Sequence, residues 1–191
     1  RPIEVLKDGF YSSMRPSHRY TSTDYHVVDA LGYDFKALTQ MAGTCKADAD
    51  INRGHPLCIA FDYNQNINWL VAGQPDEERR RLNVLKSFYV KYERKLPALI
   101  ADFCQYYDPL PMHEVVFYYD ATALGSNYAV NDQDFRWVIT HELQLHGWRV
   151  RPVYIGTPMK HIEKYQLINR GFDGKARLMP FFNEPNNPDL H

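Results

Sequence analysis

The stretch Leu57-Cys58-Ile59-Ala60-Phe61-Asp62 decides the fold of this chain, because a short apolar run ends directly at a carboxylate. A second run, Glu114-Val115-Val116-Phe117-Tyr118-Tyr119-Asp120, has the same form. Runs of this length that are rich in β-branched and aromatic residues predict strands. If the two strands are adjacent and parallel, both aspartates project from the same edge of a sheet.

Two carboxylates at a shared edge favour a bound cation. At a separation of about 4 Å and an effective dielectric of 20, they repel each other by roughly 4 kcal/mol. A protein tolerates such a pair mainly when a proton or a divalent cation lies between the groups. Asp62 and Asp120 are therefore candidate metal ligands. The alternative is that each aspartate caps the turn after its strand.

The order of the remaining elements brings the two strands together. Turn residues after Asp62 and at residues 75–78 predict a three-strand antiparallel meander, and helices then alternate with further strands. Helical crossovers connect parallel strands with a right-handed turn. We therefore predict an α/β fold with a mixed sheet, helices on both faces, and the first strand paired with the fourth. The expected strands are 57–62, 67–74, 82–89, 115–119, 149–155 and 175–182, and the expected helices are 95–107, a helix from Asn131 to the stop at Gly147, and 159–169.

Composition limits the classes of protein that remain. The 191 residues suffice for one ordinary domain with a real core, and the formal net charge of −1 gives no global basic field for nucleic acid. The three cysteines lack paired spacing, which favours buried thiols in a reducing compartment. No apolar run approaches the ~20 residues of a membrane span. Residues 1–56 show no sustained period, so we expect a linker or wrapping segment there and the folded domain at 57–191.

Several short segments of the chain resemble a known family. The predicted topology with its two aspartates resembles the ribonuclease H-like fold, and more narrowly the nuclease domain of the large terminase subunit of tailed bacteriophages. Residues 10–20 are also similar to the linker that joins the family's ATPase to its nuclease. The matching segments in the domain are Ile59-Ala60-Phe61-Asp62-Tyr63-Asn64, Tyr118-Tyr119-Asp120-Ala121-Thr122-Ala123-Leu124-Gly125, Gly147-Trp148-Arg149-Val150, residues 158–165 and the region of Asn183.

The resemblance implies a metal-dependent endonuclease that cuts concatemeric viral DNA during genome packaging, with little sequence preference. It implies an acidic triad and two Mg²⁺ or Mn²⁺ ions when DNA is bound, with Asp62 bridging the ions and Asp120 binding one of them. The implied partners are double-stranded DNA, the ATPase motor domain of the same parent protein, the portal and the small terminase subunit. The implied location is the cytoplasm of the bacterial host, with no membrane partner.

The chain departs from the family pattern in two places. It contains no Gly-x-x-x-x-Gly-Lys-[Ser/Thr] phosphate loop, so the ATPase motor is absent from it. The family's third acid lies on a C-terminal helix, and Asn187-Pro188 has the form of a helix start that the chain does not continue. We expect the third ligand to lie beyond His191, with Asp189 and Glu184 as the candidates within the chain.

Further contacts to DNA are predicted from position alone. Asn64, Ser126 and Asn127 closely follow the two aspartates and are candidates for contact with a phosphate or a metal-bound water. Five basic residues lie around the last predicted helix and could bind the phosphates of a DNA backbone. The alternative is that they are ordinary solvated charges. These residues are Lys160, Lys164, Arg170, Lys175 and Arg177.

The sequence excludes one further function and is consistent with two others. His141 and His146 are five residues apart, about 500° of helical rotation, so they diverge and do not form the zinc site of a protease. A different nuclease of the same fold, such as a junction resolvase or a transposase-like enzyme, stays open. So does a non-catalytic module that binds DNA or serves in assembly.

Overall fold

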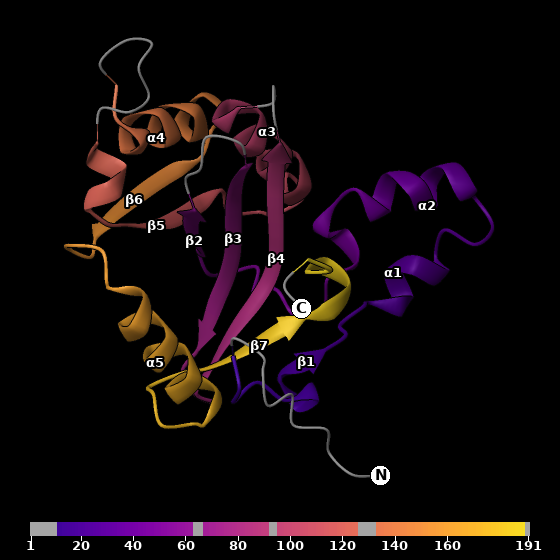
Figure 1. The fold of residues 1–191 in the computed structure, drawn as a ribbon. Coiled ribbons are helices and arrows are strands. Elements are labelled where there is room, and N and C mark those ends of the chain that lie inside the picture. Colours follow the sequence, from indigo (N-terminus) through magenta and orange to yellow (C-terminus); the bar gives the residue numbers. More distant parts are fainter. Residues whose placement is uncertain (1–10, 63–66, 92–94, 126–132, 190–191) are drawn as a thin grey trace.

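The computed structural model describes residues 11–62, 67–91, 95–125 and 133–189. Its centre is a seven-stranded mixed sheet in the order β1-β7-β4-β3-β2-β5-β6 (Figure 1). The strands are β1 Arg19–Tyr20, β2 Leu57–Asp62, β3 Ile67–Asp76, β4 Arg81–Lys91, β5 Glu114–Tyr119, β6 Arg149–Tyr154 and β7 Met179–Asn183. The α-helices are α1 Tyr25–Asp29, α2 Phe35–Ala42, α3 Leu96–Tyr107, α4 Phe135–Leu145 and α5 His161–Phe172. Short 3₁₀ helices are η1 Pro16–His18, η2 Cys45–Ala47, η3 Ala121–Leu124 and η4 Glu184–Asn186.

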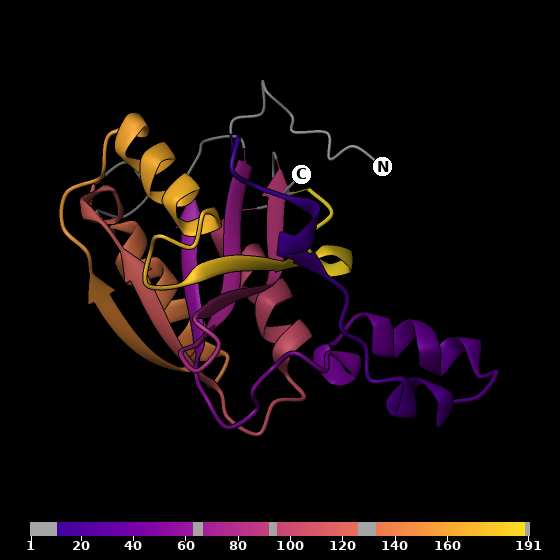
Figure 2. The same ribbon diagram turned by 90° about the horizontal axis from the view of Figure 1, so that it is seen from below.

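The predicted fold class is confirmed. Strands β2, β3 and β4 form the antiparallel meander, and β2 pairs in parallel with β5, which pairs in parallel with β6. Figure 2 shows α3 and α4 on one side of the sheet and α5 on the other. The chain therefore has the mixed, open α/β sheet expected of a ribonuclease H-like fold.

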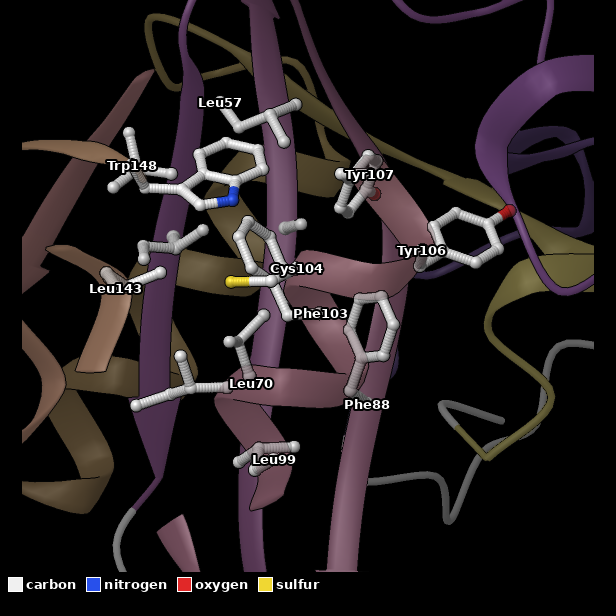
Figure 3. Close-up of a cluster of buried hydrophobic side chains, with 14 of the residues drawn as sticks. Leu57, Leu70, Phe88, Leu99, Phe103, Cys104, Tyr106, Tyr107, Leu143 and Trp148 are labelled. Atoms are coloured by element: carbon white, nitrogen blue, oxygen red, sulfur yellow. The ribbon is translucent and has the colours of Figure 1, made fainter. Parts of the chain in front are cut away.

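One face of the sheet carries the hydrophobic core. Leu57 and Ile59 of β2 and Val115 and Phe117 of β5 alternate toward it and are fully buried. Helix α3 covers this face with a stripe of buried apolar residues, and Phe103 lies at the centre of an aromatic cluster (Figure 3). We call the side of the sheet covered by α3 and α4 the inner face, and the opposite side the outer face.

Several predicted boundaries were wrong. Helix α4 begins at Phe135, and its N-cap is Asp134, whose carboxylate accepts a hydrogen bond from the backbone N–H of Trp137. Asn131, the predicted start of the helix, lies outside the described residues. The last strand begins at Met179 and not at Lys175, because residues 173–178 form the turn after α5. Asn187 is the C-cap of η4, and no helix begins there within the described residues. Its buried side-chain amide donates to the backbone carbonyls of Val84, Leu85 and Asn183.

The segment before residue 57 contributes more than a linker. Strand β1 pairs in parallel with β7 and adds a seventh strand to the sheet. It has only two residues, which is too short for a periodic pattern that could predict it. Helices α1 and α2 project to one side of the sheet (Figure 1). No helix in the described part of the chain is long and apolar enough to cross a membrane.

Candidate metal centre

Strand β2 delivers Asp62 to the edge of the sheet. Leu57 and Ile59 anchor the strand in the core, and alternation turns Cys58, Ala60 and Asp62 toward the outer face. Asp62 is exposed and stands opposite Trp69 of β3 in the antiparallel register. The strand therefore holds this carboxylate at a fixed backbone position next to solvent.

Strand β5 delivers Asp120 in the same direction. The strand ends at Tyr119, and Asp120 caps the short helix η3 by accepting a hydrogen bond of 2.8 Å from the backbone N–H of Thr122. The backbone N–H of Ala121 donates to the carbonyl of Gly156, which follows β6. Asp120 is partly buried, and the residue after it is hydrogen-bonded to the segment that follows β6.

The register aligns the two aspartates. Leu57 pairs with Val115, Cys58 with Val116 and Ile59 with Phe117, and the pairing ends three residues before either carboxylate. Continued at the same step, the register sets Asp62 beside Asp120. Adjacent strands are separated by about 4.8 Å. The prediction that these strands are adjacent, parallel and end at the same edge is confirmed, and metal binding there stays a prediction.

The donor set suits a hard cation. Mg²⁺ and Mn²⁺ prefer carboxylate oxygens, water and substrate phosphates. Asp62 and Asp120 supply carboxylates at a solvent-facing edge, and Asp120 retains an oxygen beside the one bonded to Thr122. These two side chains would therefore hold such an ion.

The third ligand is not found within the described ranges. There, no three His, Cys, Asp or Glu side chains gather into a group that could hold a metal ion. Glu184 forms an ion pair of 3.3 Å with Arg19, and Asp189 is exposed in the turn after η4. Neither joins Asp62 and Asp120 in a group of three.

The other predicted contacts divide into two sets. Asn64, Ser126 and Asn127 lie outside the described residues. The five basic residues around α5 are all exposed. Lys175 pairs with Asp173, and Arg177 pairs with Glu77 at 2.7 Å, so these two have acidic partners. Lys160, Lys164 and Arg170 are therefore the remaining candidates for contact with DNA phosphates, and that contact stays a prediction.

The two histidines of α4 diverge as expected. His141 stacks on Trp137 with ring centroids 4.5 Å apart, and His146 is the C-cap of the helix. Gly147 then adopts a positive φ of 80° and ends the helix at the predicted stop.

A second acidic cluster was missed by sequence reasoning. Asp50 accepts a hydrogen bond of 2.7 Å from the hydroxyl of Tyr20 and one of 3.1 Å from the amide of Asn183, and Asp48 accepts a bond from Tyr106. Burial raises the pKa of the Asp50 carboxyl above its usual value, and the two hydrogen bonds oppose that shift. This cluster fastens the N-terminal segment to the sheet, so its acids have a structural use.

The outer face also carries an aromatic pair and a hollow. The rings of Trp69 and Tyr89 lie 4.6 Å apart between centroids. A hollow of about 1080 Å³ opens on the same side of the sheet, with Cys58, Tyr118 and Arg151 in its lining. Alternation along 67–71 and 87–91 could have indicated that the aromatic residues share a face.

The sequence matches no known protein-family profile and no curated protein sequence.

Proposed function

We propose that this chain is a metal-dependent DNA endonuclease of the ribonuclease H-like class, which cleaves concatemeric viral DNA during genome packaging. The observation that supports the proposal is the common edge at which adjacent parallel strands β2 and β5 present Asp62 and Asp120. Open α/β sheets bind ligands outside the carboxyl ends of their strands. The proposed partners are double-stranded DNA, an ATPase motor of the same parent protein, the portal and the small terminase subunit, in the cytoplasm of a bacterial host.

Asp62 and Asp120 would hold one or two Mg²⁺ or Mn²⁺ ions. Bound cations of this kind stabilise the charge on the attacking and leaving oxygens when a phosphodiester is hydrolysed. The task of the chain itself is to hold both carboxylates in place. Strand pairing fixes the backbone of Asp62, and the hydrogen bond from Thr122 orients the carboxylate of Asp120. This rigidity matters because catalytic groups lose activity when they are displaced by about 1 Å.

The test is nicking of supercoiled plasmid in the presence of Mn²⁺. We expect Asp62→Asn to lower the nicking rate by at least a hundredfold, because the neutral amide removes the charge that holds the cation, while the melting temperature is unchanged. The matched control is Asp34→Asn, since Asp34 is an N-cap on the projecting helix α2 where asparagine serves equally well. Nicking by Asp62→Asn at the wild-type rate would contradict the proposal.

A further inference from the structure

The outer face of the sheet presents an aromatic row beside the acidic edge. Asp62 of β2 stands opposite Trp69 of β3, and Trp69 stands opposite Tyr89 of β4. Side chains at directly opposed positions begin about 5 Å apart. Asp62, Trp69 and Tyr89 therefore follow one another across three neighbouring strands, which run side by side in Figure 1.

These rings are accessible from solvent. Tyr89 is 38% exposed and Trp69 is half-buried, whereas Leu70 and Phe88 beside them face the core. The surface next to the row is low, because Ala60, Val71 and Ser87 occupy the next row of the same face. On the outer face, the large rings of Trp69 and Tyr89 therefore lie next to a row of smaller side chains.

One cation lies beside this row. Lys91 places its ammonium group 5.0 Å from the centre of the Tyr89 ring. Arg151 of β6 is aligned with Cys58, four residues before Asp62, and the hollow that it lines also carries Asp76, Glu77 and Glu114, so this arginine adds no charge beside the row. A ligand suited to the row therefore has flat rings that stack and a negative charge that pairs with Lys91.

We propose that the outer face binds an unpaired DNA strand, with a base stacked on the Trp69–Tyr89 pair and the backbone directed past Asp62. Proteins that bind single strands combine aromatic platforms with a basic surface along the backbone, and sheet-borne aromatic residues stack bases in the same way. The bases of a duplex are already stacked on one another, so the platform selects locally melted or frayed DNA. Its use for cleavage rests on the proposed endonuclease function, whereas the binding itself does not.

The row gives the stacked base a defined relation to the acidic edge. Tyr89 and Asp62 are separated by two strand spacings, about 10 Å. A nucleotide whose base lies on Trp69 therefore has its own or the next phosphate near Asp62. This arrangement assigns to Trp69 the role of a positioning residue for the strand that is cut.

The experiment measures binding of a fluorescent oligo(dT) strand to the full chain in EDTA, so that binding is separated from metal-dependent cleavage. We expect Trp69→Leu to weaken binding by about 5- to 150-fold, the loss of one stacked base. Trp69→Phe retains a ring and should restore most of the affinity. Trp137→Leu is the matched control, because Trp137 is an exposed tryptophan on α4, and it should bind like the wild type.

An oligonucleotide with abasic sites completes the cycle. The wild type should bind the abasic strand more weakly than oligo(dT), because the abasic strand has no base to stack on Trp69. Trp69→Leu should bind the two strands equally, because the tryptophan ring that a base would stack on has already been removed. The proposal would be overturned if wild type and Trp69→Leu preferred oligo(dT) over the abasic strand by the same factor. It would also be overturned if Trp69→Leu bound oligo(dT) as tightly as the wild type. A third contradicting result is that Trp69→Leu loses as much affinity for a fully paired duplex as for oligo(dT), which would indicate phosphate contacts alone.

The two proposals fail separately. If Asp62→Asn still nicks plasmid, the proposed metal centre is wrong. The proposed stacking on Trp69 is then still tested by binding of the abasic strand. If Trp69→Leu binds oligo(dT) normally while Asp62→Asn has lost cleavage, the platform is wrong and the endonuclease proposal stands.

Discussion

The inner and outer faces of the sheet differ in what their residues contact. On the inner face, Leu57, Ile59 and Phe117 meet α3 and α4 and are fully buried. On the outer face, their neighbours in the same strands include Ala60 and Tyr118, which are exposed. Strands buried on both faces read as continuous apolar runs, and β2 and β5 have such runs although Ala60 and Tyr118 are exposed. The comparison shows that β2 and β5 devote one face to the core and leave part of the other face exposed, whereas Val116 on that face is buried.

The difference between the faces has a consequence for mutations. Residues on the inner face should change the free energy of unfolding strongly, and any loss of activity should follow from unfolding. Exposed side chains on the outer face should change binding with little effect on stability. Phe103→Ala and Tyr118→Ala test this division.

The largest effect on stability is expected at Phe103. Its ring is fully buried and lies within 6 Å, between centroids, of Phe88, Tyr107 and Trp148. Phe103→Ala should lower the free energy of unfolding by about 3–5 kcal/mol, because a large cavity replaces the ring. Urea denaturation followed by circular dichroism measures this change.

The matched change on the outer face is Tyr118→Ala. Tyr118 is 39% exposed, so we expect a loss of less than about 1 kcal/mol. Equal losses at Phe103 and Tyr118 would show that the outer face is also core, and the division between the faces would be wrong.

The second effect concerns an outer-face position that does not tolerate change. Gly73 lies at an irregularity in the β3–β4 register, and an added Cβ would meet the backbone oxygen of Asn83 at 2.8 Å. Gly73→Ala should therefore cost about 1–3 kcal/mol, because the backbone must shift to admit the methyl group. Thermal unfolding measures the cost.

Gly54→Ala is the control for that substitution. The nearest atom to its added Cβ is a side-chain oxygen at 3.6 Å, an ordinary contact. This variant should be as stable as the wild type or slightly more stable, since alanine restricts the unfolded chain. A similar loss in both variants would mean that close approach at the bulge is not the cause.

Much of the fold follows from local sequence signals. The apolar runs of β2 and β5, the turn residues between the first three strands and the helices between the later ones predicted the meander, the crossover and the pairing of β2 with β5. What could not be predicted depends on contacts distant in sequence. Strand β1 exists because two residues meet β7, and Asn187 is fixed by carbonyls about a hundred residues away.

The candidate site was predictable only in part. Asp62 and Asp120 were predictable because Asp62 ends β2 and Asp120 directly follows β5, so the pairing of the two strands aligns them. Trp69 and Tyr89 carry no motif, and their shared row depends on the register between β3 and β4. In a sheet a shift of one residue would have turned either ring to the other face, so sequence alone could not establish the pair.

The smallest expected effect is a pH dependence at the rim of the outer-face hollow. Asp50 lines that hollow, and burial raises its pKa above the ordinary value of 3.8. A raised pKa in the folded state means that folding favours the protonated form. The contribution of Asp50 to stability is therefore fully present below pH 3.8 and is lost as the pH rises through the folded-state pKa.

Asp50→Asn should remove this dependence, because asparagine does not ionise. We expect the stability of Asp50→Asn relative to the wild type to increase as the pH rises from below 3.8 to neutrality. The measurement is urea denaturation of both proteins at a series of pH values. Tyr20→Phe sharpens the test, because it deletes the hydroxyl that donates to the Asp50 carboxylate and so should destabilise the fold more at neutral pH than in acid. A stability difference between Asp50→Asn and the wild type that stays constant across this range would mean that the carboxyl is as well solvated in the fold as in the unfolded chain, and the rim of the hollow would then be open to water.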